Sequence, residues 1–114
     1  MNVSLNGFRE STVTFESEEG LAAGMPVKVT ANGTVGPCAD GDDFCGVCIN
    51  TRCGYAAVQL GGYVCLPYDG AAPTVGYQNL CAASDGKSKT TETGGRSLLV
   101  TDVDEAAQTC GVIL

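Results

Sequence analysis

Histidine and tryptophan are both absent from the 114 residues of this chain, and basic residues are scarce. Without histidine, a single chain cannot supply Ser-His or Cys-His catalysis, a histidine general base or a histidine-ligated metal. Six Lys and Arg residues stand against thirteen Asp and Glu residues, which gives a formal net charge of −7. Because binding to nucleic acid and to anionic membranes relies on clustered Lys and Arg, the composition argues against both partners.

Long apolar runs are missing as well. No stretch reaches the roughly 18 apolar residues of a membrane span. The first 20 residues carry Arg9 and four Glu residues in place of the basic start and apolar core of a signal peptide. We therefore expect a soluble protein synthesised in the cytoplasm. Its length leaves room for one domain, since single domains commonly run about 100 to 150 residues.

Seven cysteines are unusual for so short a chain. Their odd number, without an export signal, favours reduced thiols, and Cys65 and Cys110 occupy strand-like segments as small buried hydrophobes. A tighter group with one Cys-x-x-Cys pair is the alternative site for zinc or redox chemistry: Cys38, Cys45, Cys48 and Cys53. Zinc ribbons pair two such motifs on turns, and a redox pair opens a helix, whereas this pair lies inside an apolar run. We expect no metal and no cofactor.

Alternating apolar residues and tight turns predict an all-β fold. In residues 25–31, Met25, Val27, Val29 and Ala31 are predicted to line a buried face, and Asn32-Gly33 follows as a hairpin turn. The apolar run at 44–50 predicts a strand covered on both faces. Further strands are predicted at residues 55–60, 63–66, 99–104 and 110–114, with a hairpin turn at Gly61-Gly62. About seven or eight short strands indicate a compact sandwich or barrel.

The remaining segments are less regular. Residues 1–19 alternate weakly and end in an acidic cluster, which predicts a flexible, extended N-terminal arm before a single β domain at 20–114. Residues 77–83 are expected to form a short strand or helical turn. Residues 84–95 are polar and are expected to form a mobile loop, and residues 104–108 at most a turn of helix.

Two groups of carboxylates are candidate sites. Asp40, Asp42 and Asp43 lie in a glycine-containing loop that resembles a calcium site, but an ordinary Asx turn explains them better. Asp102 and Asp104 are predicted to share a strand face with Val100, opposite Leu99, Thr101 and Val103. Paired carboxylates serve glycosidases, yet neighbouring carboxylates more commonly form a solvated face. We therefore expect no enzymatic activity.

The four tyrosines are candidates for an interface, because tyrosine is apolar with a polar tip. Packing between strands is an equally weighted explanation. Together with the loop at residues 68–70, they leave open a carbohydrate-binding or cell-surface-binding module. The residues concerned are Tyr55, Tyr63, Tyr68 and Tyr77.

Most of the chain resembles small capsid-associated proteins encoded beside the major head protein in tailed bacteriophages and prophages. The similarity spans roughly residues 20–114. Its motifs are turns and strand edges rather than catalytic residues. They lie at residues 21–29, 32–35, 42–47, 55–64, 67–77 and 99–104.

The resemblance implies a head decoration or cement protein: a virion structural protein on the capsid exterior that binds between major capsid subunits. It further implies a homotrimer with an N-terminal arm that orders on the shell. The arm would then supply apolar capsid contacts through Val3, Leu5, Phe8, Val13 and Phe15. The acidic charge suits an outer face away from packaged DNA. A small cysteine-rich zinc or redox module and a carbohydrate-binding or cell-surface-binding module remain the alternatives.

Overall fold

The computed structural model describes residues 10–114 of the chain. These residues form ten β-strands and one short 3-10 turn, so the predicted all-β fold is confirmed with more strands than the seven or eight expected. The first five strands are β1 (Ser11–Ser17), β2 (Pro26–Ala31), β3 (Thr34–Pro37), β4 (Gly46–Arg52) and β5 (Tyr55–Gly61). The others are β6 (Tyr63–Pro67), β7 (Gly76–Ala82), β8 (Ser88–Thr90), β9 (Arg96–Asp104) and β10 (Thr109–Ile113), with the turn η1 (Ser84–Gly86) between β7 and β8.

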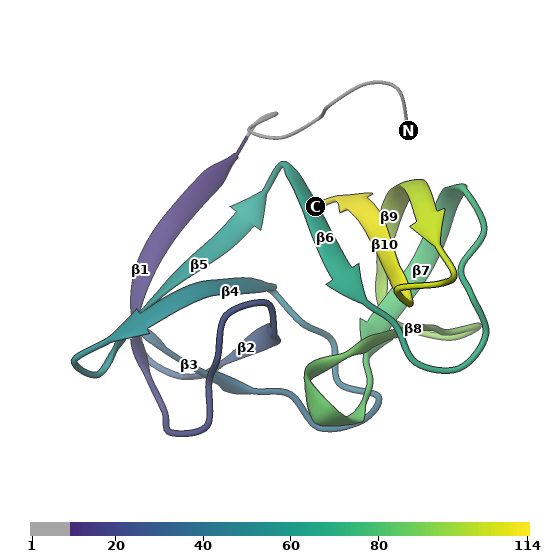
Figure 1. Cartoon of the computed structure of the whole chain (residues 1–114). Coiled ribbons are helices and arrows are strands. Elements are labelled where there is room, and N and C mark those ends of the chain that lie inside the picture. Colours follow the sequence, from purple (N-terminus) through teal and green to yellow (C-terminus); the bar gives the residue numbers. More distant parts are fainter. Residues whose placement is uncertain (1–9) are drawn as a thin grey trace.

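The strands form two sheets that divide the described chain in sequence order (Figure 1). The first five strands make a closed barrel in the order β1-β3-β2-β4-β5. The last five make a second sheet in the order β6-β10-β9-β7-β8. The barrel and the second sheet lie side by side, so the fold contains a barrel without being one barrel throughout.

Strand β1 closes the barrel, which corrects the predicted arm at residues 1–19 for Ser11–Ser17, whereas residues 1–9 lie outside the described residues. It pairs antiparallel with β5 from Ser11 to Glu16 and parallel with β3 at Glu16 and Ser17. Its pairing opposite Ala56 turns Phe15 toward the barrel core. The uncharged, β-prone run at 11–15 completes the barrel, and closure removes the sheet edges that an open five-stranded sheet would leave.

The second sheet is almost closed by its own loop. An isolated parallel bridge joins Tyr68, just after β6, to Ser88 at the start of β8. Asp69 donates its backbone N–H to the Ser88 carbonyl at 2.8 Å, and the buried Ser88 hydroxyl donates to the Pro67 carbonyl at 2.9 Å. The prediction of a mobile polar loop at 84–95 was therefore wrong, because this segment contains β8 and links the two edges of the sheet.

A β-bulge in β9 changes the predicted alternation of side chains. Gly111 of β10 pairs with Asp102, and the next residue, Val112, pairs with Val100, which leaves Thr101 as the extra residue. As a result Val100 is buried in the core and Val103 also packs against it. The prediction that these two valines face opposite ways was wrong, since a bulge adds one residue to the period of two.

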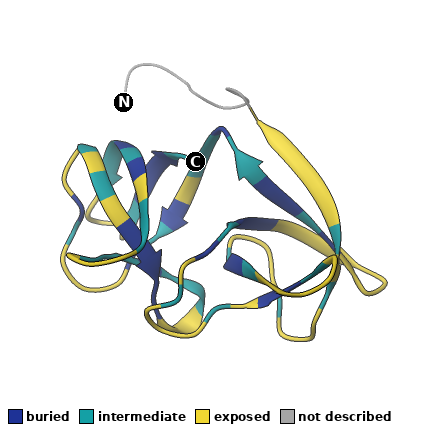
Figure 2. Ribbon diagram, turned by 180° about the vertical axis from the view of Figure 1, so that it is seen from behind, coloured by how far each residue is buried: buried dark blue, intermediate teal, exposed yellow. Residues whose placement is uncertain are grey.

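Each sheet has its own hydrophobic core, visible as dark blue ribbon in Figure 2. The barrel core contains Val27, Val35, Cys48, Ala56 and Val58. The core of the second sheet includes Leu66, Tyr68, Leu80, Leu98, Val100, Cys110 and Val112, together with Phe44 and Val47 from the first half of the chain. Phe44 and Val47 thus tie the two halves together through shared apolar packing.

Two predicted buried faces are only partly buried. Val29 is 54% exposed and Ala31 is exposed, because β2 pairs with β4 only at Pro26 and Val27 and beyond them has a strand partner, β3, on one side only. In the run 44–50, burial ends at Cys48. The outer halves of the β2–β3 hairpin and of the β4–β5 hairpin extend beyond the core, so their apolar residues are exposed to solvent.

The glycine pair at residues 61 and 62 connects the two sheets and does not form the predicted hairpin. Gln59 is 5% exposed, and its Nε2 atom donates to the carbonyls of Gly61 at 3.0 Å and Tyr63 at 2.8 Å. Gly62 adopts a φ of 86°, which favours glycine. The Gln59 amide therefore satisfies the carbonyls of Gly61 and Tyr63, where the chain passes from the first sheet to the second.

Candidate functional site

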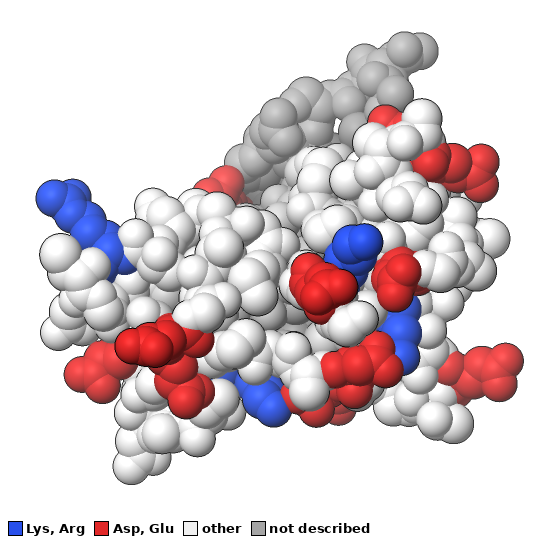
Figure 3. All heavy atoms as spheres, turned by 60° about the horizontal axis from the view of Figure 1, so that its bottom comes forward, with Lys and Arg blue, Asp and Glu red and all other residues white. Residues whose placement is uncertain are grey.

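The acidic loop between β3 and β4 holds the barrel to the second sheet. Asp42 forms an ion pair with Lys28 of β2 at 2.5 Å and accepts the Ala39 backbone N–H at 2.9 Å. Asp40 forms an ion pair with Lys89 of β8 at 3.0 Å. Figure 3 shows Asp and Glu side chains spread over the lower face, with Lys and Arg side chains next to some of them. The side chains of this loop therefore connect the barrel to the second sheet.

The other end of this loop is fixed by Arg96 of β9. The Arg96 guanidinium donates to the Cys45 carbonyl at 2.9 Å and lies 5.9 Å from the centre of the Phe44 ring. Asp43 accepts the Gly95 backbone N–H at 3.0 Å. Hydrogen bonds to a carbonyl and a cation–π contact both favour a fixed guanidinium. Asp43 and Arg96 therefore join the end of this loop to β9 and to the residue before it.

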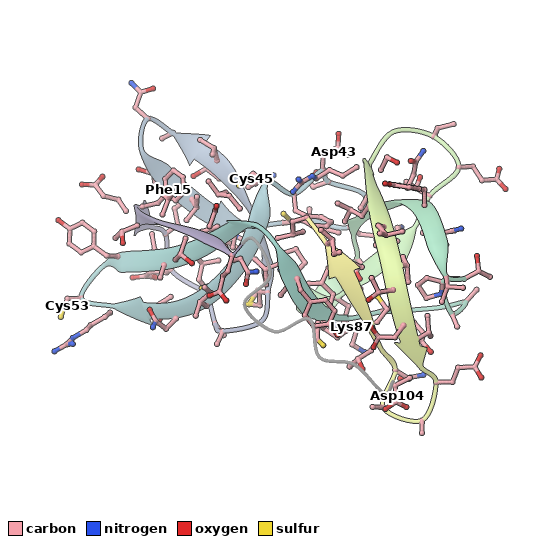
Figure 4. The ribbon with its side chains drawn as sticks, turned by 90° about the horizontal axis from the view of Figure 1, so that it is seen from above. Phe15, Asp43, Cys45, Cys53, Lys87 and Asp104 are labelled. Carbon is pink, nitrogen blue, oxygen red and sulfur yellow. The ribbon has the colours of Figure 1, made fainter. Side chains whose placement is uncertain are left out.

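The structure separates the four cysteines of the alternative zinc or redox site. Cys38 packs against the core of the second sheet, Cys45 packs against the barrel core, and Cys48 lies inside that core. Cys53 is exposed in the turn after β4, at the far end of the molecule from Asp104 (Figure 4). Within residues 10–114, no group of three or more His, Cys, Asp or Glu residues is placed to hold a metal ion. The structure does not assemble these four thiols into a ligand set.

Burial makes most of the thiols weakly acidic. It raises the pKa of Cys38 and of Cys110 to about 11 in each case. It also raises the pKa of Cys45, Cys48 and Cys81 above the usual 9.0. Thiolates are the reactive form of cysteine, so these five side chains are poor nucleophiles near neutral pH.

A polar cluster lies on the outer face of the second sheet. The Tyr63 hydroxyl donates to Asp102 Oδ1 at 3.2 Å and lies 3.4 Å from the Cys65 sulfur. Thr101 donates its hydroxyl to the same Asp102 oxygen at 2.7 Å. The contact with Cys65, burial and the nearby Asp102 carboxylate raise the pKa of Tyr63 above its usual 10.0. The cluster links β6 to β9 through neutral donors and one carboxylate.

The two carboxylates considered as a glycosidase pair have different structural roles. Asp102 accepts from Tyr63 and Thr101, whereas Asp104 caps the turn between β9 and β10. Its Oδ1 atom accepts the backbone N–H groups of Ala106 and Ala107, each at 3.1 Å. Such contacts are typical of an Asx turn. Each carboxylate thus has its own hydrogen-bond partners, although both line one groove beside the turn after β9.

The four candidate interface tyrosines fall into three environments. Tyr55 is 52% exposed on β5 and Tyr77 is 74% exposed on β7, whereas Tyr63 is half-buried. Tyr68 is only 4% exposed and belongs to the core of the second sheet. The prediction of an interface role for Tyr68 was wrong, because its strand direction turns it inward where the sheet nearly closes. The tyrosine loop of the carbohydrate alternative thus lacks an accessible aromatic ring at this position.

The exposed Tyr77 ends an apolar row across the outer face of the second sheet. Register places Tyr77 of β7 opposite Leu99 of β9, Leu99 opposite Ile113 of β10, and Ile113 opposite Tyr63 of β6. We call these four residues the outer row. Direct cross-strand partners point to the same face, and their neighbours Leu98 and Val112 fill the core on the other face. Leu99 and Ile113 were not predicted as surface contacts, because only the strand order brings them beside Tyr77.

The candidate arm residues divide at the edge of the described chain. Val3, Leu5 and Phe8 lie outside the described residues. Val13 and Phe15 lie in β1, where Val13 is 42% exposed and Phe15 is half-buried against the barrel core. Figure 2 shows β1 as a largely exposed strand. In this structure Phe15 packs against the barrel core, and the capsid contacts of Val13 and Phe15 stay a prediction.

Among the shallow grooves of the described chain, two lie one on each half of the molecule. The barrel groove, about 410 Å³, lies on the outer face of β1, β4 and β5 and is lined by Thr14, Asn50, Arg52, Cys53, Tyr55 and Ala57. The acidic groove, about 630 Å³, lies beside the turn after β9 and is lined by Pro73, Thr74, Val75, Asp102, Val103, Asp104 and Glu105. Neither groove was predicted, since each combines residues from separate strands.

Comparisons with known proteins add no assignment to this geometry. No helix among residues 10–114 is both long enough and apolar enough to cross a membrane. A scan against protein-family models finds no match to the chain. A search of curated proteins also finds no match.

Proposed function

We propose that this protein is a bacteriophage virion structural protein that decorates the capsid exterior and stabilises it by binding between major capsid subunits. It acts as a homotrimer, without catalysis, and without contact to nucleic acid or membrane. The resemblance of residues 20–114 to small capsid-associated proteins supplies the setting. The outer row supplies the physical argument.

The outer row is the observation that carries the proposal. Tyr77 is 74% exposed at its edge, and Leu99 and Ile113 continue it over adjacent strands of a rigid sheet. Aromatic and aliphatic residues gathered on one face are typical of the centre of a protein interface. Each contact needs only moderate affinity, because an oligomer that engages several capsid subunits gains avidity.

The rest of the molecule suits a passive, rigid binder. The acidic loop is fixed to both halves by the ion pairs of Asp40 and Asp42, and Arg96 fixes its far end. Fixed elements lose little conformational entropy on docking, so more of the contact energy is left for affinity. A surface that braces neighbouring subunits requires this kind of stiffness.

The direct test is cryo-electron microscopy of heads from the phage or prophage that encodes the protein. Heads stripped of the protein are imaged before and after purified protein is added back. We expect extra density at regular positions on the outer shell that returns on addition. Bare shells under both conditions would reject the proposal.

A matched pair of variants locates the contact. Tyr77→Ala removes the most exposed side chain of the outer row, and we expect it to weaken binding to expanded heads about tenfold or more. Val29→Ala truncates another exposed apolar side chain, on the hairpin of β2 and β3, and serves as the control. Equal binding by both variants would place the capsid contact elsewhere on the molecule.

A further inference from the structure

Most cations of the described chain are committed to internal contacts. Lys28 and Lys89 form the ion pairs of the acidic loop, and Arg96 is held by Cys45 and Phe44. Within residues 10–114, Arg52 belongs to no ion pair and is exposed at the end of β4. Arg52 shares a further groove with Glu18 and Glu19 but forms no ion pair with either, so its charge is available for a contact outside the fold.

Arg52 borders a surface with the composition of an interface. It lies directly opposite Tyr55 across the turn between β4 and β5, and Tyr55 is 52% exposed. Both residues line the barrel groove, whose other members include the small side chains of Thr14 and Ala57. Arg and Tyr are enriched where interfaces derive most of their binding energy, so this groove resembles one half of a contact.

The acidic groove offers the complementary half. Its lining contains three carboxylates, Asp102, Asp104 and Glu105, and no Lys or Arg. No ion pair involves these three carboxylates within the described part of the chain. Val75 lies among them with 66% of its surface exposed, which gives the groove an apolar contact inside its acidic rim. A partner that fits this groove presents a cation beside an aromatic or aliphatic side chain.

The two grooves cannot meet within one copy. Figure 4 shows Cys53, which lines the barrel groove, and Asp104, which lines the acidic groove, at opposite ends of the molecule. The longest dimension of the chain is 36 Å. A contact between copies is the arrangement that brings the Arg52 guanidinium to the carboxylates of the acidic groove, which have no ion-pair partner in the described part of the chain. Such a contact joins two different surfaces, so it is heterologous and closes into a ring when the rotation allows.

The net charge of −7 does not prevent this association. At physiological ionic strength the screening length is about 8 Å, so charges at the far ends of two copies contribute little. The charges at the contact itself decide the energy, and there the signs are opposite. Complementary charges also set which surfaces meet, because any other pairing of acidic surfaces brings like charges together.

We propose that copies of this protein associate head to tail, with the barrel groove of one copy docked on the acidic groove of the next. Arg52 and Tyr55 supply the cation and the aromatic ring, and Asp104, Glu105 and Val75 receive them. This inference rests on the part of the proposed function in which the protein acts as an oligomer. None of these five residues belongs to the outer row.

A charge exchange tests the contact on the purified full-length protein. Sedimentation velocity is measured for the wild type, Arg52→Glu, the double variant Asp104→Lys/Glu105→Lys, and all three changes combined. We expect the wild type to sediment as a multiple of 11.6 kDa. Arg52→Glu and the double variant should each weaken association about tenfold or more, and the combined variant should restore it because the opposite charges are exchanged.

Two controls separate contact from misfolding. Lys87→Glu makes the same charge change outside both grooves and should leave association unchanged. Asp104 also caps its turn, so circular dichroism and a urea midpoint establish that each variant is folded. A wild-type protein that stays monomeric, or an oligomer indifferent to both reversals, would overturn the inference.

Capsid binding distinguishes this inference from the proposed function. A monomeric wild type that still decorates expanded heads would sink the head-to-tail contact and leave the proposed function standing. An oligomer that responds to charge exchange but does not bind heads would support the head-to-tail contact and reject the proposed function. If the wild type is monomeric and Arg52→Glu abolishes binding to heads, the barrel groove belongs to the capsid, and the inference is wrong.

Discussion

The hydroxyl of Tyr63 donates a hydrogen bond to Asp102 Oδ1 at 3.2 Å, across the strand that separates them. Tyr63 belongs to β6 and Asp102 to β9, and β10 runs between the two at Gly111. A Cβ atom at Gly111 would collide with the carboxylate of Asp102 and with the Tyr63 ring and hydroxyl. This glycine is therefore needed for the close approach of two side chains.

Substitution of Gly111 by alanine should destabilise the protein. The added methyl group requires Tyr63 and Asp102 to move apart, and overpacking of this kind costs about 1 to 3 kcal/mol. Urea unfolding measures the loss. In a Tyr63→Phe background the hydroxyl is already gone, so the same change should cost less. Equal costs in the two backgrounds would show that Gly111 and Tyr63 are not coupled.

Acid should weaken the contact between Asp42 and Lys28. Hydrogen bonds from Lys28 and from the Ala39 backbone hold the pKa of Asp42 below its usual 3.8. A depressed pKa gives stability that is fully present above the unfolded value and is lost as pH falls through the folded value. We expect Asp42→Asn to flatten the fall in urea midpoint below about pH 4. Glu92→Gln, at an exposed position, is the control, and an equal effect from it would contradict the prediction.

Thiol reactivity should divide the seven cysteines into two groups. Cys53 and Cys65 are exposed, and for Cys65 this corrects the prediction of a buried side chain. The other five cysteines are buried or half-buried with raised pKa values. At about pH 8 a disulfide reagent should therefore modify two thiols rapidly and all seven only in denaturant. Cys53→Ser should remove one rapid equivalent. A third rapid thiol in the native protein would show that one of the two sheets opens readily.

Replacing Ser88 by alanine should weaken the near-closure of the second sheet. The Ser88 side chain is fully buried, and its hydroxyl donates to the Pro67 carbonyl at 2.9 Å. Loss of a buried hydrogen bond that leaves one partner behind costs about 1 to 3 kcal/mol. Urea midpoints compare this variant with Ser84→Ala, which changes an exposed serine in the same segment. No difference between the two would mean that the bridge at Ser88 contributes little.

Some parts of the fold followed from local sequence patterns. The hairpin at Asn32-Gly33 formed as predicted between β2 and β3, because its glycine takes a φ of 66° and the flanking residues favour strands. The closing strands at 99–104 and 110–114 also correspond to β9 and β10. These elements depend on neighbours in sequence, so periodicity and turn chemistry are sufficient to find them.

Other parts depended on distant partners. The Gly61-Gly62 pair was predicted to form a hairpin turn. Instead, β5 and β6 belong to different sheets, and the Gln59 amide donates to the carbonyls of Gly61 and Tyr63 between them. Residues 11–15 looked like an arm, but β5 and β3 accept β1 and close the barrel. A short polar or weakly alternating segment does not reveal which strand lies beside it, since pairing energy comes from residues far along the chain.

The sequence by itself determined the all-β class and showed that basic residues are scarce. It also supplied four tyrosines as candidates for an interface. Only the tertiary structure decided which of those tyrosines reach solvent: Tyr77 and Tyr55 are exposed, whereas Tyr68 is buried. It also decided that Leu99 and Ile113 join Tyr77 in one row, and that Arg52 keeps a free charge while Lys28 and Lys89 do not. The physical reason is that exposure and pairing depend on strand order, which brings together residues that the sequence separates by up to half the chain.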